Sequence, residues 1–208
     1  WDGFLALLRR TRPRQPLNGI IVALGVDMLA RLDAGQRAEH ARTVRKRIRE
    51  LEQKLGQRLP VYFLITKADL LPGFTETFDD LDRETRAQVW GFTFPPEAGP
   101  EGAVGQLGAE FQALLTRLQE RLLERLQAER GPAQRAAIAG FPAQFASLRP
   151  SLESFAKAAF GGTRLDPACF LRGVYFVSGT QEGTPIDRLT GALARTFGLD
   201  APRMAQAS

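Results

Sequence analysis

Three short apolar runs, at residues 20–26, 61–65 and 174–178, form the most regular hydrophobic pattern in the chain. Each is rich in β-branched or aromatic residues and is bounded by polar, Gly or Pro positions, which is typical of strands buried on both faces of a sheet. A helical apolar repeat fills residues 36–56, between the first two runs. This strand–helix–strand order predicts a parallel pair with a right-handed crossover. The sequence therefore predicts an α/β fold with three parallel strands.

Two further helical stripes separate the second and third runs. The first fills residues 106–130 and the second residues 141–160, where Pro150 is expected to bend the helix. Together they predict an antiparallel helical hairpin, inserted as a subdomain at 106–162. A Gly- and Pro-rich stretch at 95–105 is the expected hinge before it.

The remaining segments give weaker patterns. Residues 1–12 are expected to be an amphipathic helix. Residues 75–94 begin with acidic positions, as a helix does, and 90–96 resembles an extended segment or loop. Thr184 as N-cap and Pro185 after it open a predicted helix at 184–197, whose apolar face carries Ile186, Leu189, Leu193 and Phe197. Residues 1–94 and 171–198 would form the α/β part, and 199–208 a flexible tail.

The composition is that of an ordinary globular protein, with 44% hydrophobic and 25% charged residues. A single cysteine, Cys169, and a single histidine exclude a disulfide framework and a zinc site built from Cys and His. Cys169 lies in an apolar patch and is expected to be a small buried hydrophobe. No apolar run is long enough to span a bilayer, and a start without Met suggests an excised fragment.

The positive charge is concentrated on one predicted helix. Residues 37–58 contain eight Arg and Lys against three Glu, which accounts for the whole net charge of +5. A solvated helix face is the simplest interpretation. The alternatives are binding to an anionic membrane surface, to an acidic partner or to nucleic acid. Specific nucleic-acid binding is not expected, because the basic residues lack interleaved aromatics.

Candidate chemistry lies at the carboxyl end of run 61–65, where open α/β sheets bind ligands. The turn there reads Thr66-Lys67-Ala68-Asp69. The Asp69 carboxylate matches the two adjacent donors of a guanine base, and the aliphatic stem of Lys67 can cover the base or ribose. The Thr66 hydroxyl can tie this turn to the next loop. That second loop, Ser178-Gly179-Thr180, leaves the third run at the same sheet edge, and its backbone N–H groups can meet the base oxygen.

These two loops resemble the base-recognition half of P-loop GTPases, although the second matches only at Ser178. The resemblance implies a partial GTPase-like sheet. The phosphate-binding motif Gly-x-x-x-x-Gly-Lys-[Ser/Thr] and an Asp-x-x-Gly switch occur nowhere in the 208 residues. We therefore expect no catalytic residue, no metal site and no nucleotide hydrolysis from this chain alone. The alternative is a piece of an active GTPase or ATPase, with GTP or ATP and Mg²⁺ bound by the parent protein.

Four sequence blocks, at 16–21, 64–74, 89–94 and 171–187, together resemble the IcmF/TssM family of the bacterial type VI secretion system. The resemblance covers roughly residues 1–200, and its last block is the most specific. It implies a structural, NTPase-like cytoplasmic domain of an inner-membrane protein, in contact with TssL and baseplate proteins.

The GTPase resemblance also predicts which strand is unpaired. In GTPase topology the last three strands follow one another in the sheet, and the first of them pairs with the phosphate-loop strand. Strand 20–26 would then have an exposed edge, or pair with another chain, which makes it a possible site of self-association.

Overall fold

The structure is a computed structural model that describes residues 2–86, 88–96, 102–162 and 166–178. Its sheet has four strands in the order β1-β2-β4-β3. Strands β1 (Ile20–Gly25), β2 (Pro60–Thr66) and β4 (Phe170–Phe176) are parallel, and β3 (Trp90–Thr93) runs antiparallel to β4. The three predicted parallel strands are confirmed, with β2 in the middle. Among the described residues β1 is an edge strand, as predicted.

Several predicted boundaries were wrong. The sheet is mixed, because β3 adds a fourth strand where the sequence suggested an extended segment or loop. The helix expected at 75–94 is replaced by two short ones, α4 (Phe74–Phe78) and α5 (Arg83–Arg86). The third strand spans Phe170–Phe176, whereas the sequence predicted 174–178. A likeness to the GTPase sheet does not follow from strand order alone and stays a prediction.

The helix between β1 and β2 is fixed by local signals at both ends. Strand β1 stops at Gly25, because Val26 already begins a short helix, α2 (Val26–Arg31). Helix α3 (Ala34–Leu55) follows, with Asp33 and Gln36 forming a reciprocal capping box. Gly56 ends it in the left-handed conformation, at φ 68°. The predicted helix 36–56 is therefore confirmed, with a start two residues earlier.

The inserted segment forms three helices and a short 3₁₀ turn. The turn η2 (Gly102–Gln106) leads into α6 (Leu107–Ala128), which is followed by α7 (Pro132–Ala146) and α8 (Arg149–Phe160). The single bent helix expected at 141–160 was wrong. The break falls at Ser147 and Leu148, and Pro150 sits in the first turn of α8, where its missing N–H costs nothing.

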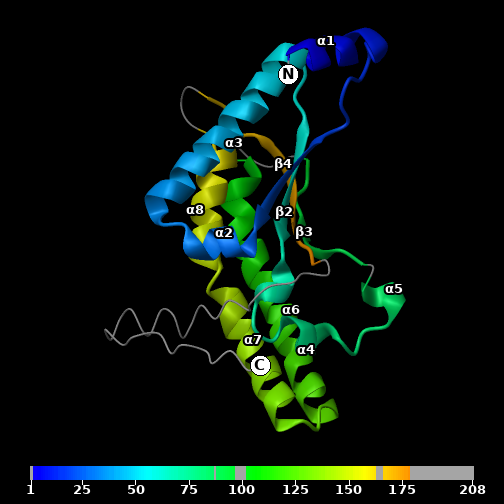
Figure 1. Cartoon of the computed structure of the whole chain (residues 1–208), viewed down its shortest axis with the longest axis vertical. Coiled ribbons are helices and arrows are strands. Elements are labelled where there is room, and N and C mark those ends of the chain that lie inside the picture. The colour runs from blue at the N-terminus through cyan, green and yellow to red at the C-terminus, as the bar shows by residue number, and fades with distance from the viewer. Residues whose placement is uncertain (1, 87, 97–101, 163–165, 179–208) are drawn as a thin grey trace, which may run out of the picture.

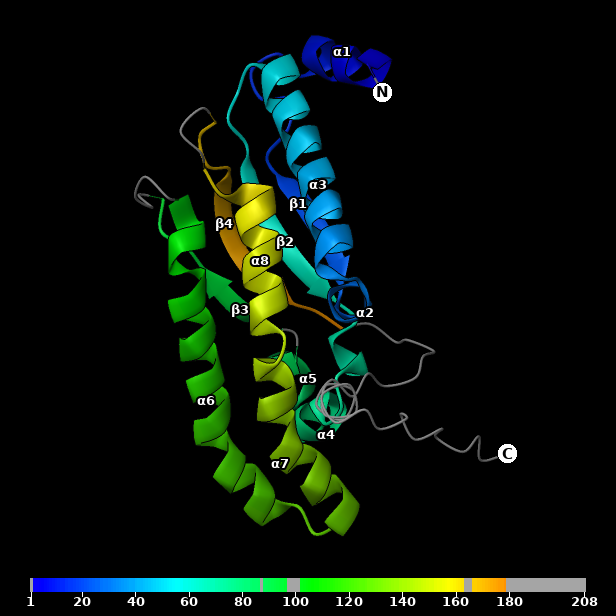
Figure 2. The same ribbon diagram turned by 90° about the vertical axis from the view of Figure 1, so that its left-hand side faces the viewer.

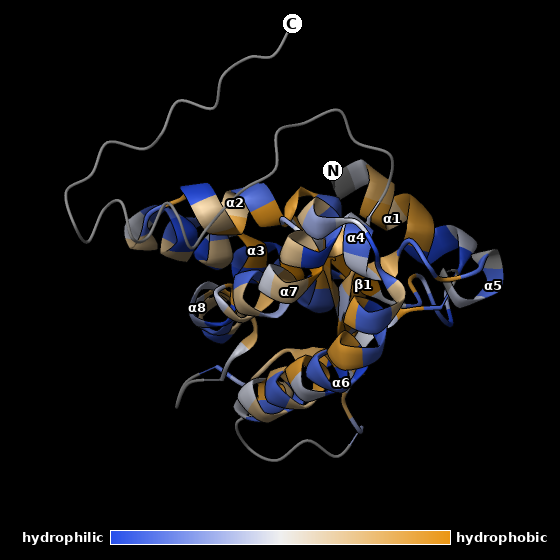
Figure 3. Ribbon diagram, turned by 90° about the horizontal axis from the view of Figure 1, so that it is seen from below, coloured by the Kyte–Doolittle hydropathy of each residue, from blue (hydrophilic) through white to orange (hydrophobic). Residues whose placement is uncertain are grey.

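Three long helices cover one face of the sheet. Helices α3, α8 and α6 lie side by side in front of the strands in Figure 2, and α3 and α8 lie to one side of the strands in Figure 1. Their orange, hydrophobic parts lie largely toward the middle of the molecule (Figure 3). One hydrophobic core joins the strands to α3, α6, α7 and α8. Whether 106–162 is a separate folding unit stays a prediction.

A small second core fastens helix α1 (Asp2–Thr11) to the far end of α3. It consists of Leu5, Leu55 and Leu59, all buried. Among the described residues no helix is both long and apolar enough to cross a membrane. The predicted helix 184–197 and tail 199–208 lie outside the described residues.

Candidate functional site

The parallel strands bring charged and polar residues together at their carboxyl ends. Asp27 follows β1 in the first turn of α2, and Ser178 lies two residues after β4. Lys67 follows β2 and adopts the left-handed conformation, at φ 59° and ψ 38°. It is the single non-Gly residue with positive φ in the described chain. This conformation turns the chain sharply out of β2 into a 3₁₀ turn, η1 (Ala68–Leu70), that carries Asp69.

Lys67 forms an ion pair with Asp27 across the two strands. Its Nζ donates to Asp27 Oδ2 at 3.0 Å, with the side chains 39% and 19% exposed. Burial acts to raise the pKa of Asp27, but the hydrogen bond and charge of Lys67 outweigh it, together with backbone donors. The pKa therefore lies below its ordinary value of 3.8. The ammonium of Lys67 is held over the end of β1.

Asp69 is tied to the neighbouring loop. Ser178 Oγ donates to Asp69 Oδ1 at 2.6 Å, and the two residues are 109 positions apart in the sequence. The backbone completes the link, since Ala68 N–H donates to the Val177 carbonyl at 3.2 Å. Asp69 Oδ2 accepts no hydrogen bond from a described residue. One carboxylate oxygen is thus fixed by Ser178, while the other is available to a ligand.

Asp69 and Ser178 also line a hollow of about 1210 Å³ between the end of the sheet and α6. Its other walls include the rings of Phe74, Phe78 and Trp90, and Arg117 stands on α6. The volume exceeds that of most small-molecule pockets, although this hollow is open on one side. Aromatic walls beside a carboxylate suit a flat ligand that carries hydrogen-bond donors. Lys67 does not line this hollow.

The structure places the predicted site residues as follows. Asp69 and Ser178 are in contact, as expected from the shared sheet edge. Lys67 lies beside them but is paired with Asp27. The Thr66 hydroxyl bonds to no described residue, so Asp69 and Ser178 make the link expected of it. Gly179 and Thr180 lie outside the described residues. A role in nucleotide binding stays a prediction for all six.

Sequence reasoning missed Asp27. Two signals were available, because it is acidic and because it stands at the carboxyl end of the strand next to Lys67. Its pairing depends on the register of β1 against β2, in which Gly25 lies opposite Thr66.

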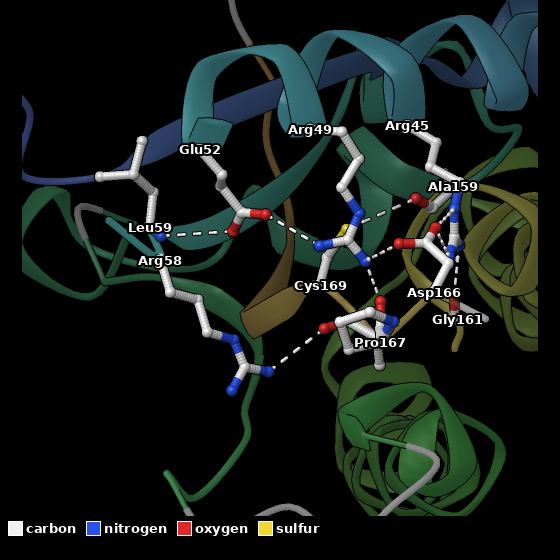
Figure 4. A network of polar contacts seen from close by, with 11 residues as sticks. Arg45, Arg49, Glu52, Arg58, Leu59, Ala159, Gly161, Asp166, Pro167 and Cys169 are labelled. Carbon is white, nitrogen blue, oxygen red and sulfur yellow. Dashed lines mark hydrogen bonds and ion pairs between the residues drawn. The ribbon is translucent and has the colours of Figure 1, made fainter. Parts of the chain in front are cut away.

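The basic stretch 37–58 is not a plain solvated face. Arg45 and Arg49 both form ion pairs with Asp166, at 2.5 and 2.9 Å (Figure 4). They also donate to the backbone carbonyls of Gly161 and Pro167. These contacts bind the connection before β4 to α3. The simplest interpretation was therefore wrong for these two arginines, and less cationic surface remains for nucleic acid or a membrane.

Cys169 lies inside this network and is 3% exposed (Figure 4). Its Sγ donates to the Ala159 carbonyl at 3.7 Å. Burial raises the pKa of the thiol, so the reactive thiolate is disfavoured. The expectation of a small buried hydrophobe is confirmed.

Comparison with known proteins gives two matches. The family described as the IcmF-related N-terminal domain matches residues 1–208. The type VI secretion system component TssM1 of Pseudomonas aeruginosa (strain PAO1) is 49% identical over 209 residues, which is 99% of this chain and 19% of that protein. The chain thus spans about a fifth of the length of this relative. No solved structure matches.

Proposed function

Because this chain belongs to the IcmF-related family, we propose that it is an assembly domain of the type VI secretion membrane complex and carries the base-recognition half of a nucleotide site. The proposal has two parts with different support. The secretion role rests on the likeness to TssM1, a type VI secretion system component. The base-recognition role rests on the geometry at the carboxyl ends of the strands.

The single observation that supports base recognition is the contact between Ser178 and Asp69. This contact joins the turn at 66–69 to the loop that begins at Ser178, the two segments that the sequence pattern assigns to base recognition. A carboxylate held by one hydroxyl keeps acceptor capacity for the N1–H and amino group of guanine. The adjoining hollow offers aromatic walls against which the base can stack.

The setting and the partners follow from the family resemblance. We propose that the domain lies on the cytoplasmic side of the inner membrane and contacts TssL and baseplate proteins. The free edge of β1 favours a further contact between copies of the chain, because an edge strand exposes unpaired backbone groups.

The alternative function is a working GTPase or ATPase that energises secretion, with Mg²⁺ and a phosphate loop supplied by the parent protein. The absence of the phosphate-loop motif from these 208 residues favours the assembly role for this chain. A Gly-x-x-x-x-Gly-Lys-[Ser/Thr] motif in the parent protein, upstream of residue 1, would favour the enzyme instead.

Nucleotide binding by the intact protein tests the base-recognition role. We expect GTP to bind more tightly than ATP. Asp69→Asn should lower the affinity for GTP at least roughly tenfold, since a charge-assisted bidentate contact is lost. The same substitution should improve binding of XTP, because xanthine carries a carbonyl where guanine has its amino group. Glu120→Gln, an exposed charge change on α6, is the control. Unchanged GTP affinity and base preference in Asp69→Asn would contradict the assignment.

A further inference from the structure

The sheet has one face that no described helix covers. Both crossovers, β1 to β2 and β2 to β4, step in the same direction across the sheet. Right-handed crossovers in one direction place their helices on the same face, and α3, α6 and α8 all lie there (Figure 2). The connections among the parallel strands therefore leave the opposite face bare.

The bare face is apolar and well exposed. We call it the open face, and define it by the residues that alternate with the core positions: Ile21, Ala23, Tyr62, Leu64, Thr93 and Tyr175. Ile21 and Ala23 are exposed, whereas Val22 and Leu24 between them are buried. Leu64, on the central strand β2, is also only partly buried. Parallel strands are normally buried on both sides, so this face needs a cover.

The surface of the open face is shaped by two glycines. A Cβ on Gly173 would lie 2.5 Å from Tyr175 Oη, and one on Gly91 would lie 2.9 Å from the Tyr175 ring. The ring of Tyr175 therefore lies along the sheet, where its hydroxyl hydrogen-bonds to Thr93 Oγ1 at 2.8 Å. A flat layer of this kind leaves room for a helix to pack closely.

We infer that residues 184–197 of this chain dock on the open face as an amphipathic helix. Thirty residues, 179–208, follow Ser178, which leaves β4 inside the sheet. The five residues 179–183 reach up to about 17 Å, more than the 10 Å or so between packed layers. A helix of 14 residues is about 21 Å long, close to the roughly 23 Å of the seven-residue strand β4.

The sequence of this segment supplies a matching surface. Ile186, Leu189, Leu193 and Phe197 recur on one side of the predicted helix, while Arg188 and Arg195 fall on the other. Docking of the stripe removes Ile21 and Leu64 from water at the same time. It also fixes the loop that begins at Ser178. The inference does not depend on nucleotide binding.

Paired cysteines in the intact chain test this placement. The background is Cys169→Ala, which removes the one native thiol. Leu64→Cys is combined with Leu193→Cys, on the apolar stripe, or with Arg195→Cys, on the opposite side, as the matched control. With a short bismaleimide at low protein concentration, we expect at least roughly tenfold more intramolecular product from the Leu193 pair. Equal yields, absence of the product, or cross-links between two chains would each overturn the inference.

A second measurement avoids substitution of Leu64. The alkylation rate of Ala23→Cys is followed in Cys169→Ala chains with the native segment or with Leu189→Asp and Leu193→Asp together. We expect the two aspartates to raise the rate roughly tenfold, because they release the cover from the open face. Arg188→Asp with Arg195→Asp, on the outer side, should leave it unchanged. If the stripe variant alkylates no faster than the native chain, residues 184–197 do not cover this face.

Discussion

Two polar clusters lie at opposite ends of the same parallel strands and are built differently. At the amino end, Arg45 and Arg49 share Asp166 and also donate to backbone carbonyls (Figure 4). At the carboxyl end, Asp27 pairs with Lys67 through Oδ2, and its Oδ1 is buried without a hydrogen-bond partner in the described structure. Among the described residues, Asp69 likewise accepts a hydrogen bond through Oδ1 only.

The difference indicates what each cluster does. A carboxylate shared by two arginines, each also bound to backbone, ties segments together and leaves little for a ligand. Carboxylates with spare acceptor oxygens, at the carboxyl ends of parallel strands, are placed where α/β folds bind ligands. We therefore expect substitutions at the amino end to change stability, and those at the carboxyl end to change binding.

The largest effect should belong to neither cluster but to the core between them. Phe63 is fully buried, and its ring lies 5.4 Å from Phe155 and 5.2 Å from Phe160. Phe63→Ala should cost about 3–5 kcal/mol of unfolding free energy, because it leaves a cavity under α8. Urea denaturation measures this loss. A cost below that of Asp166→Asn would show that the covered face is not the main source of stability.

Asp166→Asn comes next and probes the amino-end cluster. The substitution leaves two guanidinium groups without their shared charge, so we expect a loss of about 1–3 kcal/mol in unfolding free energy. Nucleotide affinity should not change. Glu120→Gln, measured by the same denaturation, is the control for removal of an acidic charge. The comparison between the clusters breaks down if Asp166→Asn weakens binding and leaves stability intact.

Lys67→Met tests the ion pair at the carboxyl end. Without the ammonium, the pKa of Asp27 should rise, because burial then acts with less opposition. A carboxyl group whose pKa is lower in the folded than in the unfolded state stabilises the fold at pH values above its unfolded-state pKa. This stabilisation is lost as the pH falls through its folded-state pKa. The variant should thus be less stable at neutral pH, by at most about 1 kcal/mol. The difference should vanish in acid once the pH is below the folded-state pKa of Asp27, which itself lies below 3.8.

The pH dependence is followed by denaturation, and the carboxyl resonance of Asp27 is titrated by NMR. A difference in stability that persists unchanged in acid would mean that Lys67 stabilises the fold by packing rather than by its charge.

The smallest change in stability is expected for Ser178→Ala. Ser178 is exposed, so the loss of its hydrogen bond should alter unfolding free energy by less than about 0.5 kcal/mol. Base discrimination should fall a few-fold, because Asp69 is no longer oriented by a donor. Competition between GTP and ATP for the intact protein measures this. If Ser178→Ala discriminates between GTP and ATP as well as the native protein does, the contact between Ser178 and Asp69 has no role in base recognition.

Much of the fold was predictable, because its signals are local. The apolar runs locate β1, β2 and β4, and the resemblance to GTPase topology predicts β2 in the middle. Asp33 and Gly56 bound α3 through capping, which depends on residues three or four positions apart. The strand β3 was not predicted, since four residues become a strand only when β4 offers them an edge.

The candidate site also combines features that the sequence predicts with features that depend on the tertiary structure. The sequence by itself determined that Asp69 and Ser178 follow neighbouring parallel strands, and hence that they share one sheet edge. Only the tertiary structure decided that Lys67 pairs with Asp27, that Arg45 meets a carboxylate 121 positions away, and that no described helix covers one face of the sheet. The physical reason is that periodicity encodes which side of an element is buried. Strand register, side-chain rotamers and the direction of each crossover decide which distant groups meet there.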